Sequence, residues 1–414
     1  MKRFIANSTS LSRRDFLVGA GGIGLAGLLG AANQPALAAE FIELPFANGR
    51  RELVTNFPQK GAMILQRTRP PLLETPFEVF DQGIFTPNDR FYVRWHLANI
   101  PTTIDPADLR LKVHGRVGHP LSLTMHDLLH DFPPLEIAAV NQCSGNSRGF
   151  FSPRVTGGEW DNGAMGNALW RGVRLKDVLD RAGVTAGAVQ VRFRGLDSGV
   201  VPQTPNFMKS LAVDHARDGE VMIAYEMNGE PLPVLNGFPL RLVVPGWYAT
   251  YWVKMLADIE VLDQPDENYW TSKAYRIPDT PGANITPEQK DVKTVPINRM
   301  VPRCFFTNLT DGAAVRRGQL LTVRGIAFGG DTGVAKVLVS ADAGRRWQEA
   351  RLGTNHGKYS FRQWQLPLRF AVAGPQSLMV RTVNTAGVTQ SDHPNWNPNG
   401  FMRNVIETIS LRVA

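Results

Sequence analysis

Cys143 is the residue of this 414-residue chain whose neighbours most favour chemistry. It follows the apolar stretch 135–140, a predicted buried strand, and precedes Ser144-Gly145-Asn146, small residues that let the backbone turn tightly around a thiol. Arg148 places a cation five residues further on, and a cation favours the thiolate, the form that ligates metals. The same pattern also fits a buried inert cysteine, or a disulfide with Cys304, the other cysteine.

Tyr92, Arg94 and His96 form a second candidate group, because alternate residues of a strand point to one face. The run 91–97 (FYVRWHL) has the composition of a strand, so the three side chains are expected to project together. Two donor or cationic groups side by side suit an anionic ligand, although a solvated strand face has the same composition.

Other chemistries are excluded by composition. Two cysteines cannot hold an iron–sulfur cluster, and the chain has neither a C-x-x-C-H haem-attachment motif nor an H-E-x-x-H zinc motif. We therefore expect no haem in this chain, and any metal is held by isolated ligands or arrives within an organic cofactor. The net charge of +8 comes without a long Lys/Arg run, which favours a mixed solvated surface over nucleic-acid binding.

The elements that must position these residues are mostly strands. Apolar and β-branched runs predict strands at 109–117, 121–123, 135–140, 188–194 and 240–244, and residues 173–182 have the spacing of an amphipathic helix. A proline-rich linker composition covers 276–302. Runs at 320–328, 335–341, 359–366, 378–383 and 405–413 have sandwich-like spacing. The predicted fold class is α+β, a β-rich domain followed by an Ig-like β-sandwich.

Residues 1–39 have the features of an export signal. Arg13-Arg14 precede a weakly apolar, glycine-rich stretch, and Ala36-Leu37-Ala38 forms a small-residue cleavage site. The paired arginines indicate the twin-arginine route, which carries proteins that are already folded, often around a cofactor. We therefore expect a periplasmic protein with domains at 40–283 and 284–414, and no membrane span in the mature chain.

Several motifs, in order along nearly the whole mature chain, resemble the sulfite oxidase family. The run 139–148 (AVNQCSGNSR) is similar to the family's cysteine motif, and 92–97 (YVRWHL) to its upstream Arg-x-His strand. Residues 160–164, 170–175, 225–241, 244–246 and 344–347 extend the likeness. Within the family the chain looks most like bacterial periplasmic sulfite dehydrogenases that pair with a c-type cytochrome. The resemblance implies a sulfite-oxidase-type molybdopterin-binding domain.

The resemblance also implies roles for individual residues. Cys143 matches the thiolate ligand of a single molybdenum. The substrate-pocket positions are matched by Arg94, Arg148, Trp160 and Tyr275. Two guanidinium groups suit the small sulfite anion. The cofactor-binding positions are matched by Tyr92, His96, Cys143, Asp197, Asn236, Arg241, Trp252, Val253 and Lys254. Asn236 stands where many relatives have histidine, so whether it contacts the cofactor is left open.

This set of residues predicts oxidation of sulfite to sulfate, with electrons passed one at a time to a c-type cytochrome subunit or acceptor. In the family the Ig-like domain often forms a homodimer, and a cytochrome subunit could occupy some of that surface instead. Two alternatives stay open. One is a molybdenum-dependent reductase of oxidised sulfur groups on the same scaffold. The other is a non-enzymatic periplasmic binding protein with a Cys143–Cys304 disulfide.

Overall fold

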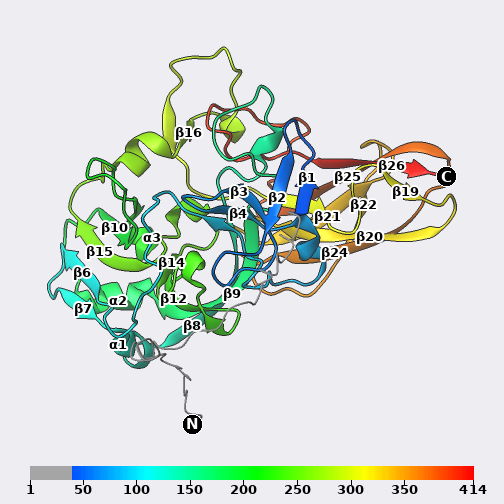
Figure 1. Ribbon diagram of the computed structural model, residues 1–414. Helices are drawn as coiled ribbons and strands as arrows, with labels where there is room; N and C mark the ends of the chain where they lie inside the picture. The colour runs from blue at the N-terminus through cyan, green and yellow to red at the C-terminus, as the bar shows by residue number, and fades with distance from the viewer. Residues whose placement is uncertain (1–39) are drawn as a thin grey trace, which may run out of the picture. The chain divides into compact units, whose positions relative to one another are not determined.

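Strands dominate the fold. The structure is a computed structural model that describes residues 40–414, so the expected export signal at 1–39 lies outside the described residues. A strand-rich first domain followed by a sandwich confirms the predicted α+β class (Figure 1). Between residues 40 and 414, no helix is both long and apolar enough to cross a membrane.

The first domain contains three larger sheets. One joins β1 (Glu40–Glu43), β2 (Arg50–Val54), β3 (Met63–Arg67), β4 (Leu72–Glu74) and β5 (Val93–Arg94) in chain order. The second has the order β11 (Met208–Ala212), β10 (Gln190–Gly195), β15 (Leu256–Leu262), β6 (Leu111–Gly115) and β7 (Leu121–Leu123). The third has the order β13 (Glu230–Pro231), β12 (Met222–Met227), β9 (Met165–Arg174) and β8 (Pro134–Gln142), and β14 (Arg241–Val243) also pairs with β12.

Helices are short and lie between the strands. The α-helices are α1 (Met125–His130), α2 (Leu175–Ala182) and α3 (Val213–Ala216). Single turns of other helix types are η1 (Phe77–Asp81), η2 (Arg148–Phe150), η3 (Val234–Asn236), η4 (Ala249–Tyr251), η5 (Trp270–Ala274) and η6 (Pro281–Ala283). Helix α2 begins two residues later than the sequence predicts, because Val173 and Arg174 still pair with β12. The run 91–97 is likewise a strand only at Val93–Arg94, where it pairs with β4.

The C-terminal domain is a sandwich of two sheets. One has the order β18 (Arg303–Phe306), β20 (Leu320–Phe328), β24 (Arg362–Arg369) and β23 (Arg351–Leu352). The other has the order β19 (Ala313–Val315), β26 (Glu407–Val413), β25 (Gly374–Asn384), β21 (Val334–Ser340) and β22 (Gln348–Glu349). An apolar core drawn from these strands includes Cys304 and Trp364, so the sandwich has its own hydrophobic centre. Upstream, β16 (Arg276–Pro278) and β17 (Thr294–Pro296) pair within the predicted linker.

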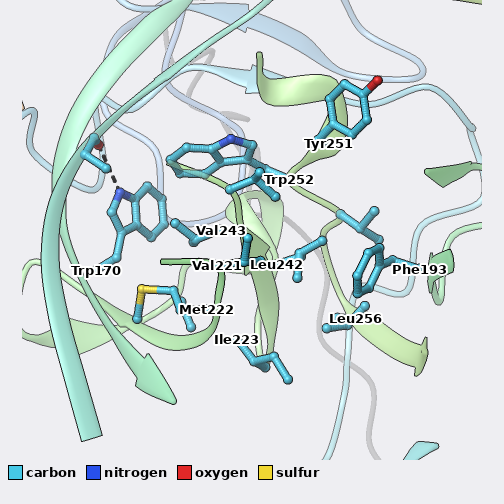
Figure 2. Close-up of a cluster of buried hydrophobic side chains, with 14 of the residues drawn as sticks. Trp170, Phe193, Val221, Met222, Ile223, Leu242, Val243, Tyr251, Trp252 and Leu256 are labelled. Carbon is cyan, nitrogen blue, oxygen red and sulfur yellow. Dashed lines mark hydrogen bonds between the residues drawn. The ribbon is translucent and has the colours of Figure 1, made fainter. Parts of the chain in front are cut away.

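Aromatic residues fill the core of the first domain. Trp170 on β9 donates from its indole nitrogen to the Ala139 carbonyl at 3.0 Å, and its ring meets Trp252 edge-on with centroids 5.5 Å apart (Figure 2). Each such ring removes about 150–250 Å² from water. This aromatic cluster therefore packs β9 against the segment that follows β14. The connection that leads into β9 is anchored on this packed core.

The connection between β8 and β9 brings three of the predicted site residues together. The two strands pair as far as Gln142 and Met165, so residues 143–164 form one long connection that contains Cys143, Arg148 and Trp160. Backbone bonds continue the ladder into it: the Cys143 amide donates to the Ala164 carbonyl at 2.9 Å, and the Gly149 amide to the Trp160 carbonyl at 2.9 Å. The thiol, the guanidinium and the indole are thereby held near one another.

Candidate functional site

Two adjoining spaces meet at Cys143. The first, which we name the inner cavity, is lined by Tyr92, Arg94, His96, Asn141, Cys143, Ser144, Phe207, Leu235, Asn236, Arg241, Ala249, Thr250, Lys254 and Tyr275. The second, the outer pocket, is lined by Gln66, Arg67, Leu72, Arg94, Cys143, Arg148, Gly157, Gly158, Trp160, Trp270, Ala274, Tyr275 and Phe401. Neither lining, drawn from residues 40–414, includes an Asp or Glu. Both spaces therefore favour anions.

Cys143 lies where the two spaces join. Its residue is 8% exposed, and it is a free thiol, as is Cys304 in the sandwich core. The disulfide between them, on which the binding-protein alternative depended, is therefore wrong. A single accessible thiol at the junction of two cation-lined spaces is suited to ligating a metal as the thiolate.

Arg241, which is buried, and Lys254, which is partly buried, are neighbouring cations of the inner cavity. Strand β14 and the segment before β15 bring them together through a backbone bridge between the two residues. Arg241 donates to the backbone oxygen of Asn236 at 3.0 Å and to Asn141 Oδ1 at 3.1 Å. Burial lowers the pKa of Arg241 to about 10, and burial together with the neighbouring Arg241 lowers that of Lys254 to about 7. An anion bound here would relieve the repulsion between them.

His96 and Tyr275 form a hydrogen-bonded pair on the wall shared with the outer pocket. The imidazole Nε2 lies 2.5 Å from the Tyr275 hydroxyl, and the imidazole stacks on Phe207 with centroids 3.8 Å apart. Burial, reinforced by Arg94 and Lys254, holds the pKa of His96 well below its usual value. His96 is therefore neutral near pH 7, and in the tautomer protonated at Nδ1 its Nε2 accepts a hydrogen bond from the Tyr275 hydroxyl.

Arg148 is held in the outer pocket by backbone rather than by carboxylates. Its Nη1 donates to the Gly158 carbonyl at 3.1 Å and its Nε to the Asn399 carbonyl at 3.1 Å. Two glycines make room for it: a Cβ on Gly145 would lie 2.0 Å from Arg148 Nη2, and one on Gly400 would lie 2.8 Å from Arg148 Cγ. The positive charge is thus fixed in place without being neutralised.

The structure brings most of the predicted residues to these two spaces. Trp252 and Val253 lie instead in the apolar core, where Trp252 packs beside Trp170 (Figure 2). Asp197 lies in a neighbouring pocket lined by residues of the segment 101–112 and of the ends of β10 and β15. Burial raises its pKa to about 6, and the opposing attraction of Lys254 is smaller than this effect. The predicted site residues that line neither space are thus Asp197, Trp252 and Val253.

Sequence reasoning did not identify Lys60, Asn141 or Phe401. Asn141 belongs to the cysteine motif itself, and its Oδ1 accepts from the Tyr92 hydroxyl at 2.7 Å, so its place in the motif was an available signal. Phe401 stacks on Tyr275 with centroids 5.4 Å apart, and the Arg148 guanidinium lies 5.4 Å from its ring centroid. Neither Phe401 nor Lys60 lies in a periodic segment, so local sequence carried no signal for them.

Comparisons with known proteins identify the family of the chain. The oxidoreductase molybdopterin binding domain matches residues 96–270, and the Mo-co oxidoreductase dimerisation domain matches 295–413. Mitochondrial sulfite oxidases of Mus musculus and Homo sapiens are each 35% identical to the chain, over 85% of this chain and 66% of theirs. Sulfite oxidase of Gallus gallus is 33% identical, over 83% of this chain and 77% of its own. The chain belongs to the sulfite oxidase family.

This family member spans about two-thirds of the length of its mouse and human relatives. A solved structure, the sulfane dehydrogenase SoxCD from Paracoccus pantotrophus, superposes with a TM-score of 0.71 and 23% identity, over 95% of this chain and 96% of that one. The likeness shows the same fold. The domain boundary expected at 283/284 falls between the two ranges that the family models match.

The inner cavity fits the molybdopterin cofactor of this family. Among residues 40–414, the buried polar atoms on its wall that lack a partner are Arg94 Nη1, Asn141 Nδ2, Ser144 Oγ, Arg241 Nε and Thr250 Oγ1. A buried donor left unpaired costs about 1–3 kcal/mol, so these atoms call for a ligand that accepts hydrogen bonds. Molybdopterin offers ring heteroatoms and an anionic phosphate, and Cys143 offers the metal a thiolate. The residues that would hold the group are Arg94, Asn141, Cys143, Arg241 and Lys254.

Proposed function

We propose that this protein oxidises sulfite to sulfate at a single molybdenum ligated by Cys143. The observation that carries the proposal is the outer pocket, in which Arg94 and Arg148 stand beside that thiol with no acidic residue among the described residues of its lining. Two fixed guanidinium groups without carboxylate partners suit a small oxyanion. Sulfite is such an anion, and its oxidation is the activity for which the mouse, human and chicken relatives are named.

Each pocket residue has a proposed part in the reaction. When bound, the molybdenum cofactor supplies the two-electron redox chemistry. Arg94 and Arg148 bind the oxygens of the anion and orient it. Trp160, which is 1% exposed, closes one wall against water. Oxidation of sulfite with water yields sulfate, two electrons and two protons. The neutral His96, 2.5 Å from the Tyr275 hydroxyl, positions that hydroxyl by a hydrogen bond.

The two electrons are proposed to leave one at a time to a c-type cytochrome, either a subunit or a separate acceptor, in the periplasm. The twin-arginine-like leader and the resemblance to bacterial periplasmic sulfite dehydrogenases support this part of the proposal. Changing Arg13→Lys together with Arg14→Lys should keep the protein in the cytoplasm, as cell fractionation would measure. Unimpaired export of that variant would contradict the route.

The activity is tested by measuring molybdenum in the purified protein and, in the same preparation, ferricytochrome c reduction on adding sulfite. We expect about one molybdenum per chain and two cytochromes reduced per sulfite, because cytochrome accepts single electrons. Cys143→Ser should abolish the reaction. Cys304→Ala is the matched control: it removes a buried thiol in the sandwich core and should keep both molybdenum and activity.

Two results would contradict the proposal in different ways. Molybdenum without sulfite oxidation, together with reduction of methionine sulfoxide, would assign the pocket to the reductase alternative. Absence of molybdenum in protein from a molybdate-replete, cofactor-competent host would remove the enzyme assignment.

A further inference from the structure

Lys60 is a buried cation that the proposed reaction does not use. It lies in the segment between β2 and β3 and is 7% exposed. Its Nζ donates to the backbone carbonyls of Asn88 at 2.7 Å and Phe91 at 2.9 Å, and to Asn236 Oδ1 at 2.5 Å. Three acceptors match the three hydrogens of an ammonium group. Burying an ammonium group costs free energy, so a specific arrangement of this kind calls for an explanation.

The Lys60 ammonium fixes the side chain of Asn236. The amide nitrogen of Asn236 donates to the Tyr92 carbonyl at 3.1 Å while its oxygen accepts from Lys60, so both ends are held and the amide has a single orientation. An amide nitrogen carries two hydrogens, and the second is still available to another acceptor. Lys60 itself does not line the inner cavity, but Asn236 does.

Asn236 in turn holds the inner cavity's guanidinium. Its backbone oxygen accepts from Arg241 Nη1, and Arg241 Nη2 donates to the same Asn141 oxygen that accepts from the Tyr92 hydroxyl. The result is a continuous hydrogen-bonded path from Lys60 to Tyr92 through three residues of the cavity wall.

We propose that Lys60 is a positioning residue of the molybdopterin site, which fixes Asn236 and Arg241 and adds positive charge behind the wall that faces the anionic cofactor. The inference rests on the cofactor of the proposed function and not on sulfite as the substrate. Burial lowers the pKa of Lys60 to about 7; the nearby Asp89 opposes this shift, and Arg241 adds a smaller lowering, so an anion bound beyond the wall would favour the charged form of Lys60.

A double-mutant cycle tests this path. Lys60→Met, Asn236→Ala and the double variant are produced in a cofactor-competent host, and molybdenum and fluorescent oxidised pterin per chain are measured after equal dialysis. Each single change should lower cofactor retention about tenfold, the effect of one charge-assisted hydrogen bond. The double variant should lose no more than the weaker-binding single variant, because the two residues act in series. Additive losses, or full retention by Lys60→Met, would overturn the proposal.

Folding is controlled separately. Lys209 is a second fully buried lysine, whose Nζ donates to the Trp270 carbonyl at 2.9 Å and lies 4.5 Å from the Tyr251 ring centroid, so Lys209→Met removes a buried ammonium that does not bond to Asn236. It should keep its pterin, and an equal loss from both lysine variants would overturn the proposal. If Lys60→Met does not fold, Lys60→Gln repeats the measurement with a neutral donor. Wild-type protein that holds molybdenum without oxidising sulfite would contradict the proposed function alone.

Discussion

The inner cavity and the outer pocket share Arg94, Cys143 and Tyr275, but the chain builds them from different parts. The inner cavity is lined only by residues between Tyr92 and Tyr275, all from the first domain. The outer pocket also takes Phe401, from the segment between β25 and β26 of the sandwich. That segment holds the Arg148 guanidinium at 3.1 Å through the Asn399 carbonyl.

This difference suits the two occupants. A cofactor is bound once and retained, so its site benefits from cations held by a continuous hydrogen-bonded path within one domain. A substrate enters and leaves at every turnover, so its pocket is more open and its arginine is held by carbonyls that leave the charge available. Variants of the inner cavity should therefore change cofactor retention, whereas variants of the outer pocket should change kinetics with the cofactor in place.

The largest expected effect separates the two regions directly. Arg148→Gln removes a substrate-facing charge, and kcat/KM for sulfite should fall by about 10- to 100-fold, the value of one charge-assisted hydrogen bond. Molybdenum per chain should stay unchanged, because Arg148 does not line the inner cavity. Arg154→Gln, at an exposed arginine of the same connection that pairs with Glu159, is the control and should keep wild-type kinetics. Loss of molybdenum from Arg148→Gln would show that the outer pocket also retains the cofactor, contrary to the separate roles given to the two regions.

A second change tests how firmly the sandwich holds the cysteine connection. Arg303 on β18 is completely buried, and it donates to Ser147 Oγ at 2.8 Å and to Glu407 Oε1 at 2.6 Å. Arg303→Met leaves the partly buried Glu407 without its cation and should lower the free energy of unfolding by about 2–3 kcal/mol. Arg324→Met breaks the exposed pair with Asp81 and should cost less than about 1 kcal/mol. Both arginines join the sandwich to the first domain, and urea denaturation measures both losses. Equal losses would show that the buried Arg303 holds the junction no more firmly than an exposed ion pair does.

Contacts of this kind mark the limit of what the sequence could predict. The strands of the sandwich follow from short apolar runs and turn residues, and the motif around Cys143 led to the right cofactor. Arg148 and Asn399 are 251 residues apart, however, and no local pattern records their contact. The central strand β9 was also not predicted from the sequence. Its residues MGNALWRGVR include two glycines, and they form a strand because they pair with both β8 and β12.

The site residues likewise divide into those with a local sequence signal and those that depend on contacts between distant parts of the chain. Tyr92, Arg94 and His96 all line the inner cavity, as the sequence predicts, although only Val93–Arg94 of this run is a strand. Trp252 and Val253 came from the resemblance alone, and the structure buries them in the core. Lys60 precedes its partner Asn236 by 176 residues and lies in a segment without periodicity, so it emerges only from the three-dimensional contact.

A smaller effect is expected where the sandwich touches the substrate pocket. Phe401 stacks almost parallel to Tyr275, at 4° between ring planes, and lies beside the Arg148 guanidinium. Phe401→Leu removes an aromatic contact of about 0.5–1.5 kcal/mol, so the sulfite KM should rise about two- to tenfold with kcat little changed. Phe306→Leu, which removes the 5.6 Å aromatic contact with Trp364 inside the sandwich, should lower stability without changing KM. Unchanged KM in Phe401→Leu would place the substrate pocket entirely in the first domain.

The smallest effect concerns a carboxyl group behind the outer pocket. Glu74 on β4 is completely buried and accepts from the Gly163 amide at 2.8 Å, and burial together with Asp161 raises its pKa from 4.5 to about 8. Between these values the folded protein holds a proton that the unfolded chain releases. The resulting stability is fully present below pH 4.5 and is lost as the pH rises through about 8.

Glu74→Gln cannot ionise, so its melting temperature should fall less steeply between pH 4.5 and 8 than that of the wild type, by a difference of a few degrees. Thermal unfolding at a series of pH values measures this slope. Glu78→Gln, at an exposed glutamate four residues further on, should leave the slope unchanged. Parallel slopes for the wild type and Glu74→Gln would mean that Glu74 is ionised in the folded protein. The outer pocket would then have a buried negative charge behind its arginines, which would weaken the electrostatic contrast between the two regions.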